Sequence, residues 1–150
     1  VTAGTVFSIM HVGGIVGRPL LGWISDKILP AVPLLSLVGF AIFLCGLALA
    51  ALSADWPYLL LCSLSFIAGV VAAGWNGVYI SEIARVMPST EVGRATGGVS
   101  AFTFLGVVIG PAIFTAIIEL SGSYSAAFLV VGTIAIGPAV ILLLQHHNQK

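Results

Sequence analysis

Ionised side chains are scarce in this sequence: five Lys or Arg and five Asp or Glu stand among 150 residues, which is 7% of the chain. A soluble domain usually carries about a quarter of its residues as charged side chains, so this composition excludes an ordinary water-exposed surface. Apolar residues make up 59% of the chain, and the mean hydropathy is +1.19. Because lipid accepts apolar side chains directly, the sequence predicts an all-α, polytopic membrane helix bundle.

An excess of charge of either sign is absent too, since the formal net charge is +0. This balance gives no reason to expect a nucleic-acid partner. Only two cysteines occur, and Cys45 and Cys62 each lie inside an apolar run, where a small packing residue is the expected role. The H-E-x-x-H zinc pattern is also absent, and we expect neither a metal ion nor a cofactor.

The charges divide the chain into uncharged stretches at 1–17, 28–54, 56–81, 95–118 and 120–149. All but the first exceed the ~20 residues that a helix needs to cross a hydrocarbon core of ~30 Å. We therefore expect membrane helices at about 1–24, 31–53, 57–84, 95–119 and 124–145. No methionine precedes Val1 and no basic residues precede its apolar segment, so we expect a fragment without a cleaved signal peptide.

The basic residues predict the orientation of these helices. They fall in alternate connections: Arg18 and Lys27 in the first, Arg85 and Arg94 in the third, and Lys150 in the tail. The second and fourth connections hold only Asp55 and Glu119. Because short loops rich in Lys and Arg stay in the cytoplasm, we expect Val1 outside and a cytoplasmic C-terminus.

Small residues spaced four apart predict close helix packing, because this spacing puts both members on one helix face. Three such pairs are Gly13 with Gly17, Gly69 with Ala73, and Gly106 with Gly110. Proline removes a helical hydrogen bond, so we expect helix kinks at the Gly110-Pro111 and Gly137-Pro138 steps.

Three segments together resemble the major facilitator superfamily of secondary transporters: "GRPLLGWISDKI" at 17–28, "SEIARVMPSTEVGRATGG" at 81–98 and "GVVIGPAI" at 106–113. That family carries a cytoplasmic G-x-x-x-D-[RK]-x-G-[RK]-[RK] loop, and Gly22, Asp26 and Lys27 match its first three fixed positions. Pro30 and Ala31 depart from the rest of the pattern. The resemblance implies that residues 1–150 are a partial transporter domain with the last five helices, eighth to twelfth. Helices two to six are the alternative.

The resemblance also implies a cytoplasmic gate, a set of contacts that closes one side of the transporter. Asp26 would accept charge-assisted hydrogen bonds from neighbouring helix ends. The expected gate residues are Gly17, Arg18, Gly22, Asp26, Lys27, Glu82, Arg85 and Arg94. The alternative is that these charges only set the topology and lie in a solvated loop.

Polar side chains at membrane depth are costly and often functional. Trp75 and Tyr79 share a helix face, with Asn76 beside it, and His11 lies about two turns before Arg18. These four residues are candidates for a substrate cavity. The alternatives are an aromatic belt, an amide bond between helices, and a neutral histidine bonded to a neighbouring helix.

We therefore expect a permease that moves a small solute by alternating access, between this chain and a missing N-terminal half. Its expected location is a bacterial inner membrane, with the bilayer as its other partner. A scaffold without transport activity is an alternative. An intramembrane enzyme using Ser8 and His11 is a remote one, so we expect no enzyme activity. The solute, the coupling ion and the mode of transport remain open.

Overall fold

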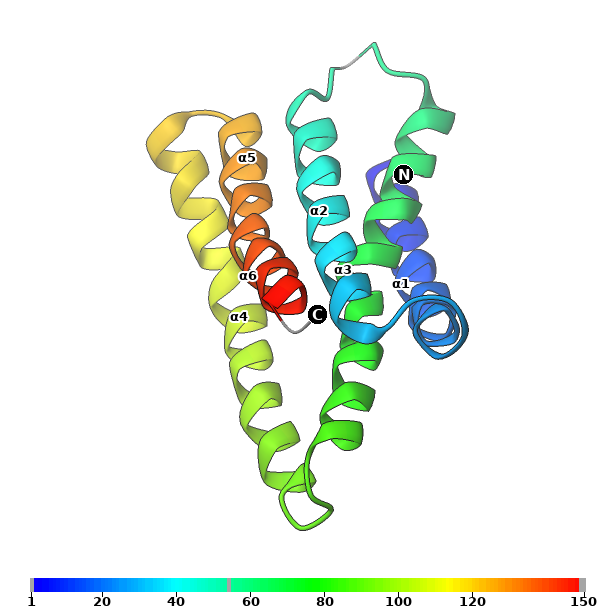
Figure 1. Ribbon diagram of the computed structural model, residues 1–150. Coiled ribbons are helices and arrows are strands. Elements are labelled where there is room, and N and C mark those ends of the chain that lie inside the picture. The colour runs from blue at the N-terminus through cyan, green and yellow to red at the C-terminus, as the bar shows by residue number, and fades with distance from the viewer. Residues whose placement is uncertain (1, 54, 149–150) are drawn as a thin grey trace.

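The computed structural model describes residues 2–53 and 55–148, and Figure 1 shows a bundle of helices. The helices are α1 (Thr2–Lys27), α2 (Ala31–Ala50), α3 (Tyr58–Val86), α4 (Val92–Ser121), α5 (Tyr124–Ile134) and α6 (Ile136–Asn148). Five helical spans are long and apolar enough to cross a membrane, with α5 and α6 together supplying the fifth. The five membrane helices expected from the charge distribution are thus confirmed. Val1 and Lys150, to which the orientation was assigned, lie outside the described residues.

The fifth span is not one helix, as expected, but two. α5 ends at Ile134 and α6 begins at Ile136. Pro138 has no backbone N–H, so the carbonyl of Ile134 loses the donor that a continuous helix would supply. The kink expected at the Gly137-Pro138 step therefore appears one turn earlier, at Ala135.

α1 is longer than expected and ends at Lys27. Our assignment of Arg18 to the first connection is wrong: Arg18 lies nine residues before the end of this helix, and the helix expected at about 1–24 already contained it. At about 1.5 Å of rise per residue, that distance is about 14 Å. Asp26 and Lys27 are also helical and close the last turn of α1.

α1 and α3 cross at close range because glycines from both helices lie at the crossing. A Cβ atom built on Gly17 would stand 2.6 Å from the carbonyl oxygen of Val70. One on Gly13 would collide with the carbonyl oxygen of Phe66, and one on Gly69 with that of Met10. The predicted pairs Gly13 with Gly17 and Gly69 with Ala73 therefore lie on this helix interface.

The predicted pair on α4 behaves differently. No atom of the described chain comes within 4 Å of a Cβ built on Gly106 or Gly110. No described residue of α4 is buried, although Phe114 makes an edge contact with Phe128 of α5, with ring centroids 5.2 Å apart. The close packing expected at Gly106 and Gly110 is therefore not made by any helix in the described part of the chain.

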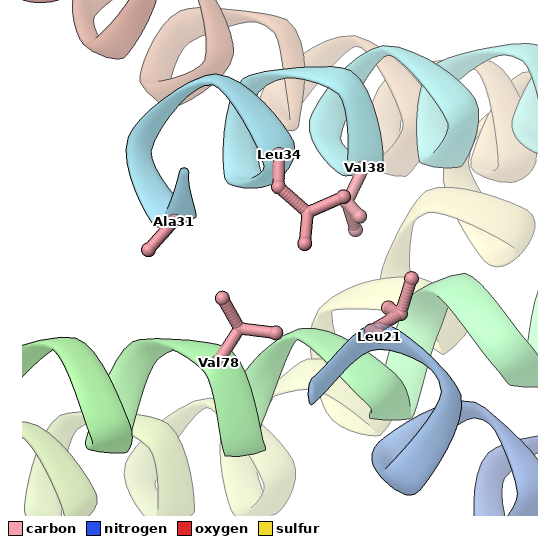
Figure 2. Close-up of a cluster of buried hydrophobic side chains, with 5 residues drawn as sticks. All are labelled: Leu21, Ala31, Leu34, Val38 and Val78. Carbon is pink, nitrogen blue, oxygen red and sulfur yellow. The ribbon is translucent and has the colours of Figure 1, made fainter. Parts of the chain in front are cut away.

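The remaining helices pack around α2. Five buried side chains from three helices form a hydrophobic cluster, shown in Figure 2: Leu21 of α1, Ala31, Leu34 and Val38 of α2, and Val78 of α3. On the opposite side, a Cβ on Gly46 of α2 would lie 2.9 Å from Cα of Gly132 in α5. α2 thus joins the α1–α3 pair to the α5–α6 span.

Candidate functional site

The two basic connections lie at the same end of the bundle, which we call the basic end. Figure 1 shows the α3–α4 connection at the lower end and the α1–α2 connection near mid-height, both below the α2–α3 and α4–α5 connections at the upper end. A pocket of ≈ 440 Å³ at the basic end is lined by Asp26, Lys27, Ser81, Glu82 and Arg85, among others. The structure therefore brings the charged end of α1 together with that of α3.

Glu82 and Arg85 form an ion pair in this basic-end pocket. Arg85 donates through Nη2 to Oε1 of Glu82 at 2.7 Å and through Nε to Oε2 at 2.9 Å. The two side chains are three residues apart on α3, as the sequence allowed. The Arg85 side chain is 71% exposed, so water screens the pair and its contribution to stability is small.

The other expected gate residues are not all collected in this pocket. Within the described part of the chain, no donor bonds to the exposed carboxylate of Asp26. Arg94 is exposed on α4 and does not line the pocket. Gly17 lies in the α1–α3 crossing, whereas a Cβ on Gly22 would meet no atom within 4 Å.

The four candidates for a substrate cavity lie at two places, and Trp75 borders both of them. Trp75 and Tyr79 face an apolar groove of ≈ 370 Å³ between α2, α3 and α6. Their rings make an edge contact, with centroids 6.2 Å apart. The lining of this apolar groove is almost entirely aliphatic, including Leu35, Val38 and Leu142.

Asn76 lies on the other side of α3, where it lines a hollow of ≈ 420 Å³ with Arg18 and Thr103. An adjoining hollow of ≈ 520 Å³ is lined by His11 and, again, by Arg18. We call the two hollows together the polar cleft; α1, α3 and α4 form its walls. It collects four of the candidate site residues that the sequence singled out: His11, Arg18, Trp75 and Asn76.

Sequence reasoning missed Thr103 and the depth of Arg18. Arg18 stands eight residues before Asp26 on an uninterrupted helix, a separation of about 12 Å, and this count could have revealed its depth. Nothing in the sequence distinguishes Thr103 from other hydroxyls. Its Oγ1 donates to the carbonyl oxygen of Val99, at 3.1 Å, as many helical threonines do.

His11 and Ser8 do not form a catalytic pair. The Ser8 hydroxyl donates to the carbonyl oxygen of Gly4, at 2.9 Å. His11 Nδ1 lies 3.0 Å from the carbonyl oxygen of Phe7, which can only accept, so Nδ1 carries the proton. Each side chain is thus bonded to its own helix, and no serine–histidine hydrogen bond is present.

The expected kink at Gly110 and Pro111 lies within α4, which remains helical from Val92 to Ser121. Thr115 Oγ1 donates to the carbonyl oxygen of Pro111, at 2.9 Å. Among the residues that the structure describes, no three His, Cys, Asp or Glu side chains are grouped to hold a metal ion.

These features define a class of protein: a helical membrane protein whose polar cleft lies between transmembrane helices. Residues 1–149 match the Major Facilitator Superfamily, so the chain belongs to this family of transporters. It is an integral membrane protein of a secondary-transporter family. No solved structure matches it.

Two similar bacterial proteins support this assignment. The chain is 30% identical over 118 residues to the "Uncharacterized MFS-type transporter YfiU" of Bacillus subtilis, covering 77% of this chain and 21% of that protein. It is 31% identical over 132 residues to the "Probable nitrate/nitrite transporter NarK2" of Mycobacterium tuberculosis, covering 87% of this chain and 32% of that protein. The chain thus spans no more than about a third of the length of these relatives.

Proposed function

We propose that this chain is the C-terminal five-helix part of a permease in a bacterial inner membrane. The permease moves a small solute by alternating access, and the polar cleft is this chain's share of the solute path. The observation that carries the proposal is the joint position of His11, Arg18 and Asn76 in one cleft beside α4. Polar groups at membrane depth usually face a water-filled cavity and often mark a substrate path.

The open surface of α4 supports this arrangement. α4 forms one wall of the polar cleft, and none of its described residues is buried within this chain. A helix that lines a path between two halves of a transporter needs no cover from its own half. The N-terminal half of the same permease would form the opposite wall.

The basic end is the cytoplasmic side in this proposal, which makes the C-terminus cytoplasmic. Asp26 is exposed and has no partner among the described residues, so it is free to accept hydrogen bonds from the N-terminal half. The basic-end pocket then contains the cytoplasmic gate, with the Glu82–Arg85 pair beside it. No enzyme activity is proposed.

Uptake of solute into liposomes by the full-length parent protein tests the proposal. The name of NarK2 makes nitrate and nitrite the first solutes to measure. Single cysteines at Asn76 and Thr103, in a background without Cys45 and Cys62, are treated with a charged, water-soluble thiol reagent. We expect modification at either position to block uptake.

Leu44→Cys provides the matched control, because Leu44 is 62% exposed on α2 and lines neither the polar cleft nor the apolar groove. The reagent should leave uptake by this variant unchanged. Uptake that is equally insensitive in all three variants would contradict the proposed path. A parent protein that moves no solute would contradict the function itself.

A further inference from the structure

Trp75 has a position that no other described residue shares, because it borders both the apolar groove and the polar cleft. The apolar groove of ≈ 370 Å³ lies between α2, α3 and α6, whereas the hollow of ≈ 420 Å³ lies between α1, α3 and α4. Trp75 lines both of them, while Tyr79 lines only the groove and Asn76 only the cleft. The indole therefore stands between two separate spaces.

The depth of Trp75 is unusual for a tryptophan in a membrane protein. Trp75 lies ten residues before Arg85 on α3, which is about 15 Å from the basic end. Half of the hydrocarbon core is also about 15 Å thick, so Trp75 lies near the bilayer centre. Tryptophan is enriched at the two membrane interfaces, where its N–H meets water. Interfacial anchoring therefore does not explain this indole.

Contacts within the chain hold the indole in place. Its Nε1 donates to the carbonyl oxygen of Ala72, at 2.9 Å, and its ring makes an edge contact with Tyr79, with centroids 6.2 Å apart. The backbone of α3 is fixed beside it, because a Cβ on Gly74 would stand 3.0 Å from the carbonyl oxygen of Gly17. The only N–H of the indole is already bonded, so the ring offers a solute no donor and acts as a wall.

The two sides of this wall differ in polarity. On the cleft side lie the imidazole of His11, the guanidinium of Arg18 and the amide of Asn76. On the groove side lie aliphatic side chains such as Leu35 and Ile42, and none of the residues that line the groove is charged. Water occupies hollows that supply hydrogen-bond partners, whereas apolar cavities stay dry. The indole thus marks the boundary between a wet space and a dry one.

We propose that Trp75 restricts the solute path to compact, hydrophilic solutes, because its indole closes the polar cleft off from the apolar groove. With the indole present, an apolar substituent on a solute is kept away from the aliphatic side chains beyond the ring. Without it, the two spaces join, and such a substituent is buried among those side chains. The restriction on solutes rests on the proposed function, whereas the separation of the two spaces does not.

Access of water to the apolar groove tests the separation. Ile42 lies eleven residues after Ala31, about 16 Å along α2, so Ile42→Cys places a thiol deep in the groove. The full-length parent without Cys45 and Cys62 is treated in liposomes with a charged, water-soluble thiol reagent. Because a charged reagent is unfavourable in an apolar space at membrane depth, adding Trp75→Ala should raise the modification rate by about tenfold or more.

Three controls accompany this measurement. Thr103→Cys, in the polar cleft, should react equally with Trp75 and with Trp75→Ala. Leu44→Cys, which is 62% exposed on α2 and lines neither space, should stay unreactive with both. Trp75→Phe keeps an aromatic ring and should raise the rate at Ile42→Cys much less than Trp75→Ala does. If the size-exclusion profile shows that Trp75→Ala fails to fold, Trp75→Leu takes its place.

The restriction on solutes is tested with urea and phenylurea, which share a polar head group and differ by one phenyl ring. Each compound is added to Thr103→Cys, and the concentration that halves the modification rate is measured. With Trp75→Ala, phenylurea should protect at a concentration lower by about tenfold or more, because its ring is buried in the groove. Protection by urea should not change.

The outcomes separate this inference from the transport function, since neither measurement requires transport. A modification rate at Ile42→Cys that is the same with Trp75 and with Trp75→Ala, whether fast or slow, would overturn the separation. Phenylurea that protects equally in both would overturn the restriction on solutes. Either result would leave the proposed function standing, whereas a parent that moves no solute would contradict the function and leave the separation intact.

Discussion

The α1–α3 crossing gives a sharp test of the packing, through the substitution Gly17→Ala. The added Cβ would stand 2.6 Å from the carbonyl oxygen and 2.8 Å from Cα of Val70. Both are backbone atoms, so no side chain can rotate away. Ordinary van der Waals contact begins at 3.4 Å, and the helices must therefore separate by several tenths of an ångström.

The expected cost follows from that separation. A radial gap of about 0.5–1 Å forfeits a quarter to a half of each dispersion contact, and overpacking in a tight core usually costs about 1–3 kcal/mol. Glycine to alanine also changes the intrinsic helix propensity, by about 1 kcal/mol in favour of the variant. A control on the same helix is needed to remove this contribution.

Gly22→Ala is that control, because its Cβ would meet no atom within 4 Å. The free energy of unfolding of both variants is measured in detergent micelles, with the full-length protein. Since the propensity change is common to both, we expect Gly17→Ala to be less stable than Gly22→Ala by about 1–3 kcal/mol. Equal stability of the two variants would refute the close crossing of α1 and α3.

Three further substitutions test other parts of the structure, each by the free energy of unfolding or by amide exchange. Glu82→Gln should lower stability by less than about 0.5 kcal/mol, because the ion pair with Arg85 is exposed; a loss above about 1.5 kcal/mol would show a buried network instead. Gly122→Ala should cost about 1 kcal/mol, because Gly122 ends α4 at a φ of 66°, and Gly122→Asn should cost less; equal stability of the parent and Gly122→Ala would contradict this. Pro138→Ala restores a donor for the carbonyl of Ile134, so α5 and α6 should become one continuous helix. The new amide at position 138 should then exchange slowly with solvent, and rapid exchange would count against our explanation of the helix break.

The membrane helices could be predicted from the sequence because lipid imposes a simple rule. A charged side chain is tolerated mainly at the membrane surface, so the spacing of the few charges marks where each helix crosses. Arg18 is the exception to this rule in the described chain, and it was misplaced for that reason. The rule places every charged residue at the end of a membrane helix. A charged residue that faces a cleft, as Arg18 does, lies inside a helix instead.

Helix partners were harder to predict than the helices themselves. Gly13, Gly17, Gly69 and Ala73 lie at a helix interface, yet the same four-residue spacing at Gly106 and Gly110 meets no atom of the described chain. Small residues permit a close approach without specifying which helix approaches. Only the three-dimensional arrangement distinguishes these two cases.

The candidates for a substrate cavity show again that the sequence does not specify which helices are neighbours. Trp75 and Asn76 are adjacent in sequence and about 100° apart around α3, so Trp75 also reaches the apolar groove, whereas Asn76 lines only the polar cleft. The sequence located both at membrane depth. It could not show that α2 and α6 lie beside Tyr79 while α1 and α4 lie beside Asn76.

The central claim is that the chain spans the lipid bilayer five times, with the basic end in the cytoplasm. Its most direct test is labelling of single cysteines at Asp55 and at Arg94, in intact cells, with a membrane-impermeant maleimide and with Cys45 and Cys62 replaced. We predict that the reagent reaches position 55 from outside the cell, and position 94 only after the membrane is opened. Labelling of both positions in intact cells would contradict this topology.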